Sequence, residues 1–212
     1  MKKNVFIALE GIDGSGKSTQ ARLLAENMQK YGLRAVVTSE PTSGPIGQLI
    51  RSILQGNMPA DHRTVAALFV ADRLEHLLDK EQGILKMLAS GYSVISDRYY
   101  FSSYAYQGSH ASLDWVIAAN SACADLLRPD LNVFIDVSPE ISLKRLAASR
   151  NALDIYETSG NLERVREKYL EAFDRMQSEE QIFITDGNRP PDMIAADIWK
   201  EVARLVQSQT IT

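Results

Sequence analysis

Short apolar runs alternate with longer amphipathic stretches along the chain. The runs indicate buried β-strands, because nearly all their positions are apolar, as in parallel strands covered on both faces. We predict five strands, at residues 5–9, 35–38, 93–97, 132–137 and 182–185. The stretches between them keep apolar residues at helical spacing. This order of elements predicts an α/β fold with a parallel sheet and right-handed crossovers.

Glycine and proline mark the expected helix boundaries. The first helix is predicted over residues 17–31, with Gly32 at its C-terminal cap. A longer helical segment is predicted from about Thr64 into the eighties, and Gly91 ends its continuation. Other helices are predicted in five places: around Ile50–Leu54, up to Leu127, from Pro139, across Val165–Phe173 and after Pro190-Pro191.

The length and net charge of the chain exclude several classes of protein. Its 212 residues can bury a substantial core and show no repeat or dividing linker, so we predict one domain over residues 1–212. The net charge of −4 argues against nonspecific binding to nucleic acid or to an anionic membrane. No apolar run reaches roughly 18 residues, which argues against a membrane span. Glu10 and Asp13 follow the first apolar run at once, so we interpret it as a strand rather than a signal peptide and expect a cytoplasmic protein.

The cysteine and histidine content gives no metal or disulfide signature. Cys123 is the one cysteine, and its small neighbours predict a buried position on a packed helix in a reducing compartment. His62, His76 and His110 lack metal-ligand spacing. We expect these three histidines at the surface or on helix flanks.

Residues 11–18 carry the strongest motif in the chain. They fit G-x-x-x-x-G-K-[ST], with a predicted strand before them and a helix after. Glycines let successive backbone N–H groups point at phosphate oxygens, and the helix N-terminus adds its positive end. Lys17 can reach the β- and γ-phosphates, and the Ser18 hydroxyl can ligate Mg²⁺. The predicted nucleoside triphosphate site comprises Gly11, Ile12, Asp13, Gly14, Ser15, Gly16, Lys17, Ser18 and Thr19.

Three classes of protein with this loop compete: small-molecule kinases, GTPase switches and assembly ATPases. A GTPase needs a guanine-reading Asn-Lys-x-Asp, and the nearest match, residues 151–154, lacks the lysine. The strand ending at Asp97 could supply the carboxylate of an assembly ATPase, but Arg98 follows directly and the chain is short for such machines. The kinase interpretation is therefore favoured.

Several segments, in order over roughly residues 5–185, resemble the thymidylate kinase family of nucleoside-monophosphate kinases. The segments are residues 10–19, 39–41, 68–73, 97–99, 102–108 and 128–131, of which Asp97-Arg98-Tyr99 followed by Ala105-Tyr106-Gln107-Gly108 is the most specific. The resemblance implies a three-layer fold of the P-loop NTPase type, with five parallel strands and a short lid. It also implies a homodimer that transfers the γ-phosphate of ATP to dTMP with Mg²⁺, giving dTDP and ADP.

The candidate site residues combine this resemblance with chemistry. Arg98 follows a strand end, where ligands bind in open α/β sheets, and its planar fork suits a monophosphate. Asp97 and Ser18 are the candidate Mg²⁺ ligands. The resemblance implies these positions: Arg51, Asp13 and Arg98 at the acceptor phosphate, Glu40 on the acceptor loop, Phe69 stacked on thymine, Arg73 on a base oxygen, and Ser103, Tyr106 and Gln107 at the base edge and sugar.

Three of these assignments have competing interpretations. Asp97 could hold Mg²⁺ through a water or merely pair with Arg98. Phe69 and Arg73 are one helical turn apart, a spacing equally typical of a core phenylalanine beside a snorkelling arginine. Ser102 or Ser103 could instead cap a helix N-terminus.

The polar segment 149–161 is the candidate lid. Gly14 stands where some family members carry a loop arginine, so the resemblance implies an arginine supplied by the lid. Arg150 is the first candidate and Arg145 the second, and Asp13, Lys17, Arg98 and Arg150 form the predicted catalytic set. The chain departs from the family at Ser39 and Ile155, where arginine is frequent.

Two alternatives to a dTMP kinase remain from the sequence. The first is a kinase of another pyrimidine nucleoside monophosphate or of a deoxynucleoside. The second is a nucleotide-dependent switch or binding module without transferase activity.

Overall fold

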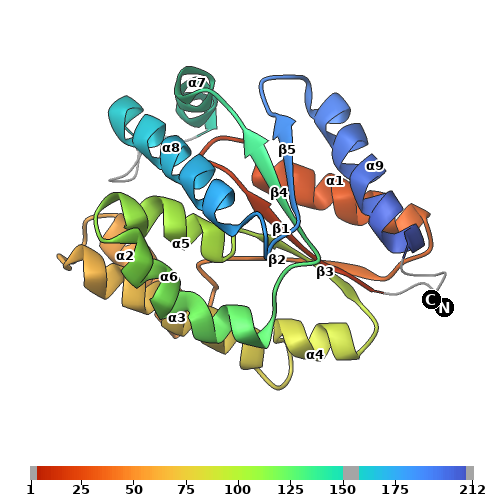
Figure 1. Ribbon diagram of the computed structural model, residues 1–212, viewed down its shortest axis with the longest axis horizontal. Helices are drawn as coiled ribbons and strands as arrows, with labels where there is room; N and C mark the ends of the chain where they lie inside the picture. The colour runs from red at the N-terminus through yellow and green to blue at the C-terminus, as the bar shows by residue number, and fades with distance from the viewer. Residues whose placement is uncertain (1–3, 150–157, 209–212) are drawn as a thin grey trace.

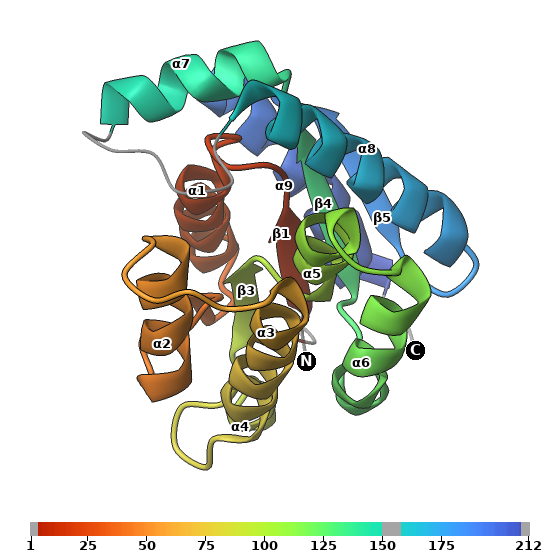
Figure 2. The same ribbon diagram turned by 90° about the vertical axis from the view of Figure 1, so that its left-hand side faces the viewer.

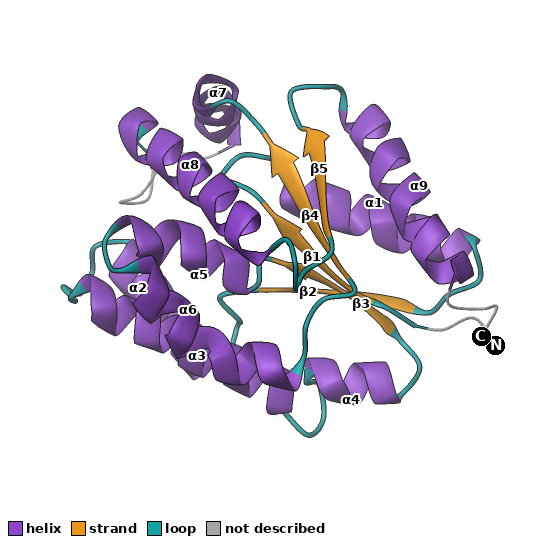
Figure 3. Cartoon of the chain, viewed as in Figure 1, coloured by secondary structure: helices purple, strands orange, loops and turns teal. Residues whose placement is uncertain are grey.

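The computed structural model describes residues 4–149 and 158–208 of the chain. Its centre is a five-stranded, all-parallel sheet in the order β2-β3-β1-β4-β5 (Figures 1 and 3). The strands are β1 (Phe6–Glu10), β2 (Ala35–Ser39), β3 (Ser93–Asp97), β4 (Leu131–Asp136) and β5 (Ile182–Asp186). All five predicted strands are confirmed, each within a residue of its predicted ends.

Helices connect the strands and cover both faces of the sheet. They are α1 (Lys17–Lys30), α2 (Pro45–Leu54), α3 (His62–Leu78), α4 (Ile84–Ala89), α5 (Tyr100–Tyr106), α6 (Leu113–Leu126), α7 (Pro139–Ser149), α8 (Ser159–Met176) and α9 (Pro191–Ser208), with a 3₁₀ turn at Gln107–Ser109. Gly32 has a φ of 86° immediately after α1, which confirms it as the predicted C-terminal cap.

The two faces of the sheet carry separate apolar clusters. In β1, Phe6 and Ala8 point to one face, where α5, α6 and α8 pack. Ile7 and Leu9 point to the other face, against α1 and α9. Figure 1 shows α1 and α9 together on the side opposite α3, α5, α6 and α8. Side chains of successive strand residues alternate between faces, so one apolar run supplies both layers of core. The predicted α/β fold with helices on both faces is confirmed.

One predicted helix is broken in the structure. The segment from Thr64 into the eighties was expected to be continuous, but α3 ends at Leu78 and α4 begins at Ile84. The Asp79 carboxylate accepts backbone N–H groups of Glu81 and Gln82, at 2.9 and 2.6 Å, which closes a turn in competition with the helix. A single helix over this segment is therefore wrong.

The parallel register aligns three strand ends at one edge of the sheet. Asp97 lies opposite both Leu9 of β1 and Ser39 of β2. The next residue of each strand or loop, Glu10, Arg98 and Glu40, is consequently brought to the same edge. Figure 2 shows α7 at this end of the molecule, over the loop that leads into α1.

Candidate active site

A cavity of about 1050 Å³ opens at the carboxyl edge of the sheet. It brings together most of the predicted site residues: Asp13, Gly14, Gly16, Lys17, Ser18, Thr19, Glu40, Arg51, Phe69, Asp97, Arg98, Ser103, Tyr106, Gln107 and Arg145. Gly11, Ile12, Ser15 and Arg73 do not line it. Arg150 lies outside the described residues.

The loop between β1 and α1 forms one wall of the cavity. Gly11 has a φ of 148°, and a Cβ there would lie 2.8 Å from the Ile135 carbonyl oxygen, so only glycine fits this approach to β4. Gly16 has a φ of 97° and is the N-cap of α1, whose first turn holds no acidic residue. The free N–H groups at the start of α1 thus remain available to an anion.

Lys17 lies against the carbonyl groups of this loop. Its Nζ donates to the Gly11 and Ile12 carbonyl oxygens at 3.1 and 3.0 Å, and the residue is buried. Burial and the positive charge of Arg98 lower the pKa of Lys17 to about 8. Water therefore stabilises the positive charge of its ammonium group poorly in this pocket. A negatively charged phosphate bound there would stabilise that charge.

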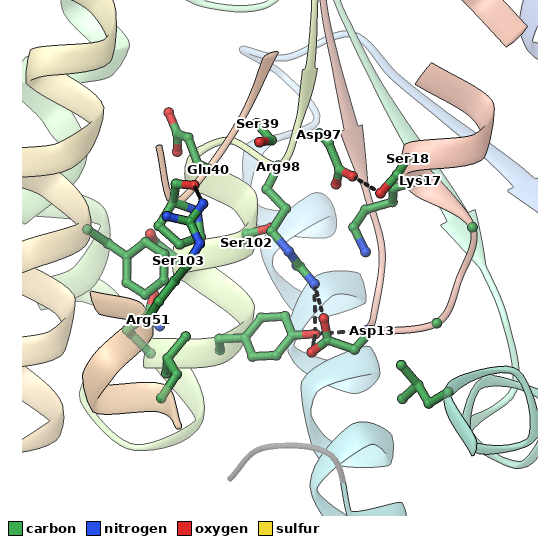
Figure 4. Close-up of a pocket in the computed structure, with 18 of the residues that line it drawn as sticks. Asp13, Lys17, Ser18, Ser39, Glu40, Arg51, Asp97, Arg98, Ser102 and Ser103 are labelled. Atoms are coloured by element: carbon green, nitrogen blue, oxygen red, sulfur yellow. Dashed lines mark hydrogen bonds and ion pairs between the residues drawn. The ribbon is translucent and has the colours of Figure 1, made fainter. Parts of the chain in front are cut away.

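Ser18 and Asp97 form a pair of hard oxygen donors. The Ser18 hydroxyl donates to Asp97 Oδ2 at 2.5 Å, beside Lys17 (Figure 4). A hydroxyl and a carboxylate on one side of a phosphate-binding loop fit Mg²⁺, which takes few protein oxygens together with phosphate oxygens and water.

Arg98 and Asp13 form an ion pair at the centre of the cavity (Figure 4). Arg98 Nη2 donates to Asp13 Oδ1 at 2.5 Å, and the Tyr106 hydroxyl donates to Asp13 Oδ2 at 2.7 Å. Burial alone would raise the pKa of Asp13, but the charges of Arg98 and Lys17 outweigh it and hold that pKa below its ordinary value. The cluster presents a guanidinium held in place on one side by a carboxylate and an aromatic hydroxyl.

Glu40, at the start of the loop after β2, joins this cavity to α3. Its Oε2 accepts from Arg73 Nε at 2.8 Å, and its Oε1 lies 3.1 Å from His76 Nδ1. Arg73 is only 1% exposed and also donates to the Ser103 hydroxyl and the Tyr99 carbonyl oxygen, at 3.2 and 3.1 Å. Arg73 thus lies behind the cavity wall, where it holds two of the lining residues, Glu40 and Ser103.

Two further contacts hold the loop that continues from Glu40. The Asp72 carboxylate accepts the backbone N–H and the hydroxyl of Thr42, at 2.7 and 2.6 Å. Arg51 donates to the carbonyl oxygens of Pro41 and Thr42. Helices α2 and α3 thus hold the loop after β2 between them.

Comparison with known proteins agrees with this geometry. The family model described as thymidylate kinase matches residues 9–198. A probable thymidylate kinase of Pyrobaculum aerophilum is 39% identical over 95% of this chain and 98% of its own length. A thymidylate kinase of Leptospira borgpetersenii is 34% identical, covering 93% and 92%, and a probable one of Pyrococcus horikoshii is 41% identical, covering 79% and 82%.

The chain belongs to the thymidylate kinase family. Its membership confirms the resemblance found in the sequence, the P-loop NTPase-type fold and the kinase interpretation. The GTPase switch and the assembly ATPase are thereby set aside.

The structure bears on the predicted lid, on the second arginine candidate and on the two serines. Residues 150–157 of the predicted lid lie outside the described residues, and residues 158–161 form the cap and first turn of α8. Arg145 of α7 donates to the Ser15 and Gly187 carbonyl oxygens at 3.4 and 2.9 Å, so it lies at the edge of the nucleotide loop. Neither Ser102 nor Ser103 caps a helix, because α5 begins at Tyr100.

The buried cysteine and two of the histidines follow expectation. Cys123 is buried on α6, and His62 and His110 are exposed and stacked, with ring centroids 4.1 Å apart. The expectation for His76 is wrong. It is buried, with Nε2 at 2.6 Å from the Thr38 hydroxyl, because its imidazole bridges β2 and Glu40. None of the helices in the described part of the chain has the length and apolar character that a membrane span requires.

Sequence reasoning did not assign a role to Glu10 or to Tyr169. The Glu10 side chain is fully buried beneath the cavity, and its Oε2 accepts from the Tyr169 hydroxyl at 3.0 Å. Burial raises the pKa of Glu10 from 4.5 to about 6, an increase limited by the hydrogen bond from Ser102 and the charge of Arg98. A carboxylate among apolar strand residues was the available signal, but nothing local identified its partner on α8.

The raised pKa of Glu10 predicts a pH-dependent stability. Folding favours its protonated form, so its stabilising contribution is complete below pH 4.5 and is lost as the pH rises through about 6. Glu10→Gln removes this titration. We expect the free energy of unfolding of the variant, relative to wild type, to increase by about 2 kcal/mol between about pH 4 and pH 7. Urea unfolding across this range measures the difference, and parallel curves for the two proteins would contradict it.

Proposed function

We propose that this protein is a thymidylate kinase that transfers the γ-phosphate of ATP to dTMP, giving dTDP and ADP. The observation that carries the proposal is the single cavity in which Lys17 and Ser18 lie across from Arg98 and Phe69, in a chain of this family. One side of the cavity suits a triphosphate and the other a monophosphate attached to an aromatic base. The two substrates would meet at the Arg98–Asp13 pair.

The reaction is an in-line displacement. An oxygen of the dTMP phosphate attacks the γ-phosphorus, and the bond from that phosphorus to the β–γ bridging oxygen breaks, so ADP leaves. Catalysis rests on positioning and on neutralising charge rather than on a covalent intermediate. Lys17 and the first N–H groups of α1 hold the β- and γ-phosphates. Ser18 and Asp97 would hold Mg²⁺, which when bound neutralises charge that develops on the phosphate oxygens.

The acceptor side uses the remaining residues. Arg98 and Arg51 bind the monophosphate, and Asp13 orients Arg98. Phe69 stacks on the base. Ser103, Tyr106 and Gln107 contact the base edge and sugar, and Arg73 acts on the same end through Glu40 and Ser103.

An arginine that meets the transferring phosphoryl group completes the site. Arg145 is the described candidate, since it already lies beside the nucleotide loop. Arg150, on the predicted lid 149–161, is the candidate that the sequence places first. Either would stabilise negative charge that spreads over the moving group.

The quaternary structure and location extend the same proposal. Family resemblance favours a homodimer, and the half-exposed Trp115 and Leu126 on α6 and Leu78 on the neighbouring α3 support one. We place the enzyme in the cytoplasm, in agreement with its one buried, unpaired cysteine.

A coupled ADP-release assay tests the proposed function. ATP and Mg²⁺ are supplied with dTMP, dUMP, UMP, CMP, AMP, GMP or thymidine as acceptor. We expect dTMP to give the highest kcat/KM, because the pocket joins a monophosphate clamp to a stacking phenylalanine. Preference for another acceptor would contradict the base assignment, and ATP binding without ADP release from any acceptor would support a binding module instead.

A further inference from the structure

The backbone at Arg98 is in an unusual conformation. Its φ is 78°, and among residues 4–149 and 158–208 it is the one non-glycine residue with a positive φ. A residue with a Cβ is uncommon in this left-handed region, where the cost is on the order of 1–3 kcal/mol unless surrounding structure determines it. The conformation turns the chain sharply between β3 and α5 and directs the Arg98 guanidinium into the cavity (Figure 4).

Three hydrogen bonds hold this turn. The Arg98 N–H donates to the Leu9 carbonyl oxygen at 2.9 Å, and the Arg98 carbonyl oxygen accepts the Ser96 hydroxyl at 2.7 Å. The N–H of Tyr99, the next residue, donates to Glu10 Oε1 at 2.9 Å. The first bond joins the backbones of neighbouring strands, and the second is local, between residues two positions apart. The third is the one that depends on a side chain of another strand, Glu10 of β1.

The second carboxylate oxygen of Glu10 contacts the Arg98 guanidinium indirectly, through two hydroxyl groups. Oε2 accepts the Ser102 and Tyr169 hydroxyls at 2.6 and 3.0 Å. The same two hydroxyl oxygens lie 3.1 and 3.4 Å from Arg98 Nη1. Because those protons can be directed toward the carboxylate, lone pairs of the two hydroxyl oxygens remain for the arginine.

We propose that Glu10 is a positioning residue that sets the backbone and side-chain orientation of Arg98 toward the acceptor phosphate. Glu10 is fully buried and does not line the cavity, so it acts through Arg98 and not on the ligand. The inference rests on the proposed function, in which Arg98 binds the monophosphate. It adds a buried residue of strand β1 to the side chains that hold Arg98, beside Asp13 on the loop after the same strand.

Glutamine is an informative replacement at this position. It keeps the length of the side chain but offers one acceptor oxygen in place of two, and an amide group that only donates. Either the Tyr99 N–H or the hydroxyl pair therefore loses its acceptor. The substitution also removes an ionised group that is costly to bury, so the fold itself is expected to persist.

The test compares the binding of dTMP and thymidine to wild type and Glu10→Gln by titration calorimetry. We expect the Kd of dTMP to rise at least roughly tenfold, the equivalent of about 1.4 kcal/mol, because the phosphate clamp is misaligned. The Kd of thymidine, which has no phosphate, is expected to change less than about twofold. An unchanged Kd for dTMP, or equal weakening of both ligands, would overturn the inference.

A matched control separates positioning from general stability. Glu180 is a second buried carboxylate that accepts a tyrosine hydroxyl, from Tyr100 at 2.5 Å. Like Glu10 it does not line the cavity, but the arginine that it contacts is Arg128. Glu180→Gln is expected to leave the Kd of dTMP unchanged whatever its effect on the melting temperature. If Glu180→Gln weakened dTMP as much as Glu10→Gln does, a specific role for Glu10 would be wrong.

Two further variants locate the effect. In an Arg98→Ala background, adding Glu10→Gln should not weaken dTMP further, because the residues act in series; additive losses would count against the inference. If Glu10→Gln does not fold, Tyr169→Phe, which removes one donor to Oε2, should give the same dTMP-selective loss at a smaller size. A wild type that neither binds nor phosphorylates dTMP would overturn the proposed function and this inference with it. A fully active wild type with an unaltered Glu10→Gln variant would overturn the inference alone.

Discussion

Replacing Lys17 with alanine is expected to lower kcat for dTMP phosphorylation by a factor on the order of 10²–10³, the usual loss when one donor to developing charge is removed. Lys17 Nζ lies at the nucleotide loop, held by the Gly11 and Ile12 carbonyl oxygens. No other side chain of the described loop residues 11–16 carries a positive charge. Steady-state kinetics with ATP and dTMP measure the loss.

Lys17→Ala is expected to lower activity without lowering the stability of the fold. Burial already lowers the pKa of Lys17 to about 8, which means that its ionised form is costly to keep in this pocket. Far-UV circular dichroism and the melting temperature are therefore expected to stay close to wild type. Lys144→Ala on α7, where the side chain is 72% exposed, serves as the control and should keep full activity. Near wild-type turnover in Lys17→Ala would contradict the assignment of the nucleotide loop.

Replacing Arg73 with methionine is expected to lower the free energy of unfolding by about 3–5 kcal/mol, the range found when one partner of a buried ion pair is removed. Arg73 and Glu40 are both buried, with 2.7 Å between Arg73 Nη2 and Glu40 Oε2. Methionine can fill the volume but leaves the Glu40 carboxylate without its cation. Urea unfolding at neutral pH measures the change.

A second arginine on the same helix provides the control for Arg73→Met. Arg63 pairs with Asp61 at 2.9 Å, but both side chains are more than half exposed, so Arg63→Ala should not change stability measurably. Adding Glu40→Gln to Arg73→Met should recover part of the lost stability, since no uncompensated charge then remains. Equal losses of unfolding free energy in Arg63→Ala and Arg73→Met would show that the buried ion pair stabilises the fold no more than the exposed one.

The features predicted well from the sequence are those with a local cause. An apolar run such as residues 5–9 forms a buried strand almost irrespective of its partners, and residues 11–18 fold around their own glycines. Strand ends of a parallel sheet share one edge, which predicted that Asp97 and Arg98 would lie near the loop after β1. The break between α3 and α4 also had a local signal, Asp79 followed by Gly83, that the helical periodicity outweighed.

The features that were missed depend on contacts between distant residues. Arg73 and Phe69 have the spacing of neighbours on a helix, but nothing near them indicated that Glu40, Ser103 and Asn120 would enclose the arginine. The contact between Glu10 and Tyr169 spans 159 positions of the chain. In such networks, buried polar groups form hydrogen bonds with residues that only the tertiary structure brings near. A single sequence does not indicate which of these residues pair.

The central position of β1 has a consequence for how the enzyme is made. Phe6 pairs with Val94 of β3, and Ile7 pairs with Leu131 of β4. Strand β1 can therefore form its hydrogen bonds only after these much later residues have been synthesised. Pairing over such separations is slow, because the loss of chain entropy precedes any stabilising contact. During synthesis, the loop at residues 11–18 cannot reach its final shape until β4 has left the ribosome. We therefore expect nucleotide binding to appear late in folding. Nascent chains that end before residue 131 should not bind a nucleotide.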